Sequence, residues 1–272
     1  MIALRTFEAS DGLVLSCADY GGEGRPPLMF VHGGSAHARW WDFVAPAFVD
    51  RFHVLALDQR GHGESPWTPD WSYGTRQYVA DLATIISRWG LGKPVLVGHS
   101  MGGHTVLNYA ADYSDELRAL VVIDAPAGYP PEAVAFLREI AERPSRPYDS
   151  LDDACAKFKT NPPQNNARPE VLRHVAEHSF RQDGDGKWVH KMDRRTLIRE
   201  PLSAWKGLAR ISCPTLYVRA ESSVLERTLA EKIAAAIPHC AYTEVANSFH
   251  HVMIDNPEGL IEVLNNFLKT LV

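Results

Sequence analysis

Short apolar runs recur along the chain, and between them apolar residues return every three or four positions. Each run is four or five residues long and several are rich in valine and leucine, which is typical of parallel strands covered on both faces. The runs predict strands at residues 28–31, 53–57, 94–97, 119–123, 215–218 and 241–245. The stretch after the second run has helical spacing at Tyr78, Leu82, Ile85 and Trp89, and Gly90 predicts the end of that helix.

The two ends of the chain complete this alternation. Residues 4–8 and 13–19 flank Ser10-Asp11-Gly12, a turn sequence that predicts a hairpin. A last helix is predicted from about residue 257 onward. Strands that alternate with helices predict an α/β protein, with a mostly parallel sheet and an antiparallel N-terminal edge.

Residues 126–212, which we call the inserted segment, interrupt the alternation. We find no convincing strand there, but helical stretches at 132–142, 151–159 and 170–180 that are separated by proline-rich joints. We therefore predict a core domain made of residues 1–125 and 213–272, with the inserted segment as a helical cap over one edge of the sheet.

Composition and charge narrow the class of protein. With 45% hydrophobic and 22% charged residues, the chain of 272 residues has the make-up of a folded domain. There is no apolar run of the ~18 residues that a membrane span needs, and 28 basic against 33 acidic residues with no basic run disfavour nucleic acid. The N-terminus has no apolar signal region and the four cysteines are scattered, so we expect a cytoplasmic protein.

The sharpest motif is Gly98-His99-Ser100-Met101-Gly102, a G-x-S-x-G directly after a predicted strand and before a predicted helix. A nucleophilic serine must project from a tight, strained strand-to-helix turn, and small residues on either side leave room for the crowded backbone. The positive end of the following helix favours an oxyanion, and the N–H of Met101 is placed to bind it.

With this motif the chain resembles the α/β-hydrolase superfamily over nearly its whole length. His32-Gly33-Gly34 is similar to the family's oxyanion loop, and residues 58–65 are similar to its D-x-R-G-x-G-x-S turn. The inserted segment lies where the family's cap sits, after the sixth strand. The resemblance implies an α/β-hydrolase fold with a mostly parallel eight-stranded sheet, a Ser–acid–His triad, and Gly34 as the second oxyanion donor.

His250 is the predicted general base. It follows the last predicted strand after a short loop, and the string from His250 to Pro257 resembles the family's H-x-x-x-x-[DE]-x-P signature. The order of serine, acid and histidine along the chain is also that of the fold.

The sequence indicates the acid of the predicted triad less clearly than it indicates the serine and the histidine. By resemblance its usual position is Ser223, which cannot orient an imidazole as a carboxylate does. Asp124 ends the sixth predicted strand, where haloalkane dehalogenase-like relatives place the acid, and residues 220–223 are similar to the corresponding string in those relatives. We predict Asp124 as the acid and keep Glu221 as the alternative.

These residues predict a serine hydrolase that cleaves a small-molecule carboxylic ester or lactone by acyl transfer, without metal or organic cofactor. Dehalogenase and epoxide hydrolase activities are disfavoured, because position 100 is serine and not a carboxylate. Three alternatives stay open: hydrolysis of a C–C bond, a cofactor-free oxygenase, and a ligand receptor or interaction protein with a degenerate site. The oligomeric state is also open.

The substrate pocket is expected between the inserted segment and the carboxyl ends of the strands. The residues predicted to line it are His37, Trp40, Trp41, Phe136, Leu137, Trp188 and Trp205.

Overall fold

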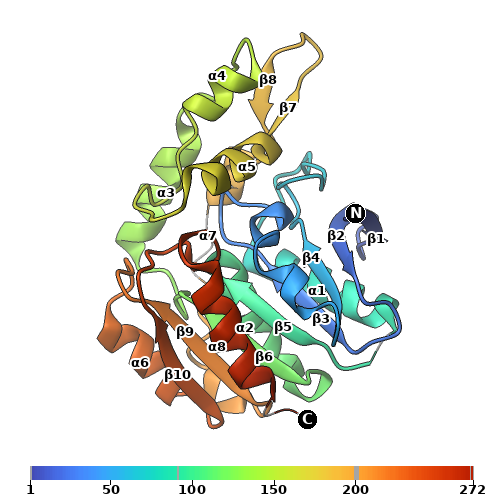
Figure 1. The fold of residues 1–272 in the computed structure, drawn as a ribbon, viewed down its shortest axis with the longest axis vertical. Helices are drawn as coiled ribbons and strands as arrows, with labels where there is room; N and C mark the ends of the chain where they lie inside the picture. The colour runs from blue at the N-terminus through green and yellow to red at the C-terminus, as the bar shows by residue number, and fades with distance from the viewer. Residues whose placement is uncertain (1, 91, 199–201, 270, 272) are drawn as a thin grey trace.

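The eight-stranded sheet predicted from the sequence is confirmed in a computed structural model, which describes residues 2–90, 92–198, 202–269 and 271. The strand order is β1-β2-β4-β3-β5-β6-β9-β10, and β2 alone runs antiparallel to its neighbours (Figure 1). The strands are β1 Ala3–Glu8, β2 Val14–Gly21, β3 Pro27–Val31, β4 His53–Leu57, β5 Val95–His99, β6 Ala119–Ile123, β9 Thr215–Ala220 and β10 Cys240–Val245.

Helices cover both faces of the sheet because the buried strands are apolar on both. In β3, Leu28 and Phe30 pack into the core with η1, η2 and α8, while Met29 and Val31 pack into the core with α1, α2 and α6. The helices are α1 Thr75–Trp89, α2 Met101–Tyr113, α6 Arg227–Ala235, α7 Val252–Asp255 and α8 Pro257–Lys269, with the short helices η1 Ala38–Trp41, η2 Ala45–Phe48, η3 Ser114–Glu116 and η5 Leu208–Arg210.

Most of the inserted segment stands at one end of the molecule, at the top of Figure 1, while its last part, with η5, returns to the core and packs against α2. It contains α3 Pro131–Glu142, α4 Leu151–Ala156, α5 Pro169–Ser179, β7 Phe180–Gln182, β8 Trp188–His190 and η4 Arg194–Leu197. The expectation that this segment lacks strands was wrong, since β7 and β8 pair antiparallel. Each has only three residues, which is too short for a period of two to appear in the sequence. The limits at residues 126 and 212 stay a prediction.

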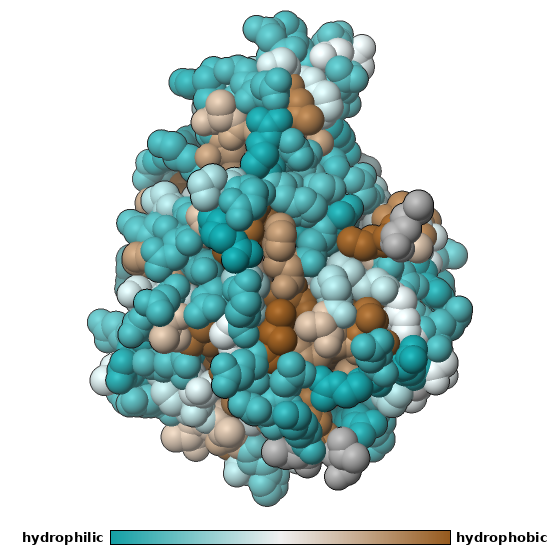
Figure 2. All heavy atoms as spheres, viewed as in Figure 1, coloured by the Kyte–Doolittle hydropathy of each residue, from teal (hydrophilic) through white to brown (hydrophobic). Residues whose placement is uncertain are grey.

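The face seen in Figure 2 is mostly hydrophilic, with apolar side chains gathered in a central band below the inserted segment. On the outer helix α8, the partly buried residues Ile261, Val263 and Phe267 pack against the core. In the part of the chain that the structure describes, no helix has the length and apolar character needed to cross a bilayer.

The topology brings several chain segments to one edge. Strands β5, β6, β9 and β10 are consecutive neighbours and parallel, so their carboxyl ends lie in a row. Ser100 directly follows β5 and Asp124 directly follows β6. Residues 221–223 follow β9, and the loop with His250 follows β10. An open parallel sheet binds its ligands at this edge.

Candidate active site

Ser100 lies in a strained turn between β5 and α2. Its φ is 51° and its ψ is −115°, a conformation that L-residues rarely adopt. The turn is fixed on both sides, because the Ser100 N–H donates to the Ile123 carbonyl at 2.9 Å and the Ser100 carbonyl accepts from the His104 N–H at 2.9 Å. The hydroxyl is thus held on the end of the sheet.

Glycine is needed on both sides of this turn. A Cβ on Gly98 would come within 2.5 Å of the Gly102 carbonyl oxygen. A Cβ on Gly102 would collide with the carbonyl of Val31 and approach that of His32 to 2.5 Å. The spacing of the motif therefore reflects how closely β5, α2 and the end of β3 approach each other.

His250 connects Ser100 to Asp124 by two hydrogen bonds. His250 Nδ1 lies 2.7 Å from Asp124 Oδ2, and His250 Nε2 lies 2.9 Å from Ser100 Oγ. A carboxylate can only accept, so Nδ1 carries the proton and Nε2 is left to accept from the serine hydroxyl. This is the protonation state that a general base for Ser100 requires.

The carboxylate of Asp124 is buried, with 1% of the residue exposed. Besides His250, it accepts from the Ala220 N–H at 3.1 Å and from the Ser223 hydroxyl at 2.7 Å. Asp124 itself has a positive φ of 46°, so a second residue of the site sits in a strained backbone conformation.

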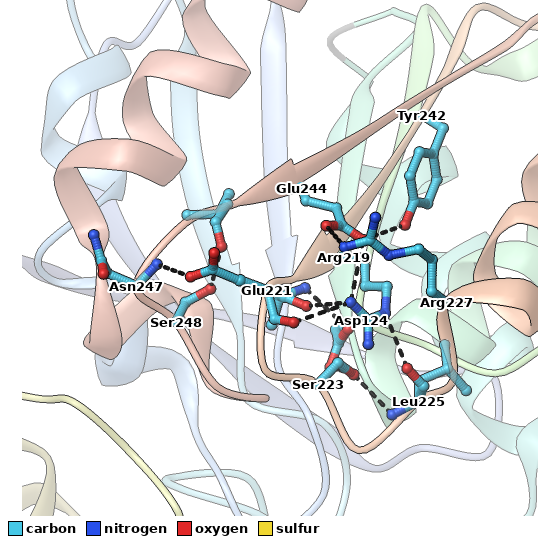
Figure 3. Close-up of polar contacts among 12 residues, drawn as sticks. Asp124, Arg219, Glu221, Ser223, Leu225, Arg227, Tyr242, Glu244, Asn247 and Ser248 are labelled. Atoms are coloured by element: carbon cyan, nitrogen blue, oxygen red, sulfur yellow. Dashed lines mark hydrogen bonds and ion pairs between the residues drawn. The ribbon is translucent and has the colours of Figure 1, made fainter.

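The carboxylate of Glu221, the alternative acid, points away from His250 and towards Asn247. This exposed carboxylate accepts from the Asn247 N–H at 2.8 Å, as Figure 3 shows. The structure therefore brings Asp124 to His250 and does not bring Glu221 there. The sequence prediction considered Ser223 only as a missing acid and overlooked that its hydroxyl can support a carboxylate at the end of the neighbouring strand β6.

Buried histidines hold the loop that carries His250. His99 Nε2 donates to the backbone carbonyl of His250 at 2.8 Å. His251 Nε2 donates to the Pro162 carbonyl in the inserted segment at 3.0 Å. Burial lowers the pKa of His99 well below its ordinary value and that of His251 to about 3, so both rings are neutral near pH 7.

Asp255 makes a second link between the inserted segment and this loop. Its Oδ1 accepts from the Asn166 N–H at 2.8 Å, and its Oδ2 accepts from the Phe249 N–H at 2.9 Å. The side chain of Asn166 also donates to the Asn247 carbonyl at 3.2 Å. We call this set of bonds, together with the bond from His251 to Pro162, the loop latch.

Met101 and Gly34, the two predicted oxyanion donors, both line the cavity in front of Ser100. Met101 opens α2, so its N–H is one of those at a helix start without an intrahelical partner. Gly34 lines the same cavity from the loop after β3. The next residue, Ser35, has a φ of 65°, which shows how sharply that loop turns.

His32 fixes the loop that carries Gly34. Its Nε2 accepts from the Gln59 N–H at 3.1 Å, so Nδ1 carries the proton and donates to the Gly33 carbonyl at 2.7 Å. In a trans peptide the Gly34 N–H points opposite to the Gly33 carbonyl. His32 thus fixes the orientation of the peptide between Gly33 and Gly34, and burial lowers the pKa of His32 to about 4, which keeps it neutral near pH 7.

A cavity of about 660 Å³ lies over Ser100, Met101 and His250. Phe136 and Leu137 line it, in agreement with the sequence. The other walls come from segments that the sequence did not single out, including Tyr129, Leu197, Val224, Leu225 and Leu229.

Five of the seven residues predicted for the pocket do not line this cavity. His37 is buried and bonded to Ser179 and Val175, and Trp41 is fully buried against Phe30. Trp188 belongs to the hairpin strand β8, and Trp205 is 40% exposed. An aromatic residue near the site in sequence says nothing about the direction of its side chain, which is why these predictions were wrong. Trp40 is also absent from the lining, since it is buried in the core and its ring packs edge-on against His251.

His99, His250 and His251 also lie close enough to hold a metal ion, with candidate ligand atoms within 4.8 Å of one another. Both nitrogens of His250 are engaged by Asp124 and Ser100, however. A metal ion bound by these three histidines would have to displace Asp124 or Ser100 from His250. The arrangement therefore favours the hydrogen bonds of His250 over a metal site.

The chain is similar to known hydrolases in both sequence and structure. The family model described as the alpha/beta hydrolase fold matches residues 26–257. N-formylmaleamate deformylase from Pseudomonas putida is 38% identical over 256 residues, which cover 92% of this chain and 90% of that protein. Esterase Rv0045c from Mycobacterium tuberculosis is 28% identical over 268 residues, covering 94% of this chain and 87% of the esterase.

Among solved structures, E-2-(acetamidomethylene)succinate hydrolase superposes with a TM-score of 0.87 at 25% identity. The match covers 99% of this chain and 100% of that one.

The neutral state of His32 predicts a pH-dependent stability. In the unfolded chain His32 takes up a proton near pH 6.5, but in the folded chain only near pH 4, so unfolding becomes easier as the pH falls between these values. At pH 5 the loss from this group is roughly 2 kcal/mol relative to pH 7.5. His32→Asn keeps a donor for Gly33 but cannot titrate. In denaturant unfolding, the difference in free energy of unfolding between the wild type and the variant should therefore be roughly 2 kcal/mol smaller at pH 5 than at pH 7.5. An unchanged difference would contradict the neutral state of His32 in the folded chain.

Proposed function

The chain belongs to the alpha/beta hydrolase fold family and is a hydrolase, and on that premise we propose that it cleaves a carboxylic ester or lactone by acyl transfer through Ser100, His250 and Asp124. The observation that carries the proposal is the continuous hydrogen-bonded chain from Asp124 Oδ2 through His250 to Ser100 Oγ, with distances of 2.7 and 2.9 Å. The strained turn at Ser100 supports it, since such strain is stored at functional sites.

In the proposed reaction His250 Nε2 takes the hydroxyl proton while Ser100 Oγ attacks the carbonyl carbon. The N–H groups of Met101 and Gly34 stabilise the negative charge on the carbonyl oxygen. His250 then gives its proton to the leaving alcohol, and an acyl ester remains on Ser100. Water, activated by the same nitrogen, releases the acid and restores the serine. Asp124 holds the ring in the required tautomer and stabilises its cation.

A second candidate is cleavage of an N-acyl bond by the same residues. The relative with 38% identity is named a deformylase of N-formylmaleamate, and the solved structure with a TM-score of 0.87 is named a hydrolase of an acetamidomethylene succinate. Both names describe N-acyl compounds that are also acids. Parallel assays with p-nitrophenyl acetate and with formanilide and acetanilide would rank the two candidates. The C–C hydrolase, oxygenase and receptor interpretations stay predictions.

Removal of the nucleophile is the direct test of the mechanism. Ser100→Ala should lower kcat for p-nitrophenyl acetate by ~10⁴-fold or more, because no covalent intermediate can form. It should also abolish labelling by a fluorophosphonate probe. The control is Ser222→Ala, an exposed serine nearby, which should keep both properties. Normal turnover by a folded Ser100→Ala protein would exclude the mechanism.

The two carboxylates give a matched pair of variants. Asp124→Asn should reduce kcat by ~10⁴-fold, because His250 loses both its tautomer and the partner of its cation. Glu221→Gln should stay within about tenfold of wild type, because its carboxylate contacts Asn247 and not His250. The opposite ranking in steady-state kinetics would transfer the acid role to Glu221.

Ser223 is proposed as a positioning residue that acts through Asp124. Ser223→Ala removes one of three donors from the carboxylate and should lower kcat about tenfold. KM should change little, since Ser223 does not line the cavity. Ser223→Thr keeps a hydroxyl and should recover most of the rate. Equal losses in the alanine and threonine variants would mean that the site needs only the volume of serine.

A further inference from the structure

The cavity over Ser100 lies between two groups of lining residues, which we call the two banks. Ala133, Phe136 and Leu137 of α3 line it from the inserted segment, and Val224, Leu225 and Leu229 line it from the stretch between β9 and the middle of α6. A volume of about 660 Å³ is within the range of ~300–1,000 Å³ that is usual for small-molecule sites. The cavity therefore has the size of a small-molecule site.

Both banks present large apolar side chains that nothing in the described chain covers. Phe136 is 56% exposed and Val224 is 66% exposed, although both line the cavity. Apolar surface of this kind favours an apolar group of the substrate, which removes it from water. Each methylene group buried there should raise kcat/KM about fourfold, the equivalent of ~0.8 kcal/mol.

Each bank also carries a carboxylate at the cavity. Glu132 belongs to the first turn of α3, and Glu226 directly precedes α6. Neither forms an ion pair with any of the described residues, and the described lining contains no lysine or arginine. Two carboxylates without an ion-pair partner repel a negative charge on a bound group and attract a positive one.

We infer that the cavity takes the longer group of a small ester as an apolar chain that is uncharged or cationic at its far end, and that it rejects a chain ending in a carboxylate. This inference takes the reaction from the proposed function. The selectivity for the bound group is argued separately, from the residues of the two banks. It disfavours acidic substrates of the kind considered for the second candidate.

Matched esters test the inference on either side of the reacting carbonyl. The acyl series is methyl heptanoate, methyl 6-(trimethylammonio)hexanoate and monomethyl pimelate. The alcohol series is heptyl acetate, 6-(trimethylammonio)hexyl acetate and 7-acetoxyheptanoate. In at least one series the carboxylate ester should have a kcat/KM at least fivefold below the neutral ester, and the cationic ester should equal or exceed the neutral one. Equal kcat/KM for the carboxylate and neutral esters in both series would overturn the inference.

A double variant tests whether the two glutamates cause the discrimination. Glu132→Gln/Glu226→Gln should bring the ratio of carboxylate to neutral ester to within about twofold of one. The control is Glu139→Gln/Glu231→Gln, which removes two exposed carboxylates from the same helices α3 and α6 at positions that do not line the cavity. The control should keep the wild-type ratio. A ratio that the first variant leaves unchanged would overturn the role of Glu132 and Glu226.

Binding without turnover separates this inference from the proposed reaction. Thermal shift and calorimetry on the Ser100→Ala protein compare decyltrimethylammonium with decanoate at matched concentration. An apparent affinity for decyltrimethylammonium at least fivefold above that for decanoate supports the inference. It does so even if no ester is hydrolysed, and in that case only the proposed reaction is wrong. Equal or tighter binding of decanoate overturns the inference and leaves the reaction standing.

Discussion

The buried carboxylate of Asp124 is the constraint on which the site depends. A charge that is removed from water is costly unless it is hydrogen-bonded, and Asp124 is satisfied by donors that come from three other places in the chain. These are the Ala220 N–H at the end of β9, the Ser223 hydroxyl beyond it, and the His250 ring after β10. Each donor fixes the segment that carries it, so the row of parallel strand ends and the orientation of the imidazole are set together.

Much of this arrangement was accessible from the sequence. The strands at 53–57 and 119–123 have the predicted limits, because residues buried on both faces form unbroken apolar runs. The motif around Ser100 was readable since two glycines are enforced by close backbone contacts. The roles of Ser100, His250 and Asp124 stay predictions, but the proximity of these three residues follows from a sheet whose carboxyl ends meet at one edge.

The remainder depends on side-chain direction, which spacing does not encode. Asp124 and Glu221 both follow strand ends, and only the fold shows that one faces His250 while the other faces Asn247. Trp41 follows Gly34 by only seven residues in sequence but points into the core against Phe30. The cavity walls combine α3 with residues almost a hundred positions later, so no local pattern could have joined them.

The loop latch connects the lining of the cavity to the loop that carries His250. Pro162 lines the cavity and also accepts the bond from His251, the immediate neighbour of His250. A displacement of the stretch that contains Pro162 and Asn166 would loosen the loop on which His250 sits. The position of this stretch of the inserted segment and the position of His250 thus depend on the same hydrogen bonds. A ligand that shifted Pro162 would also shift the imidazole that contacts Ser100.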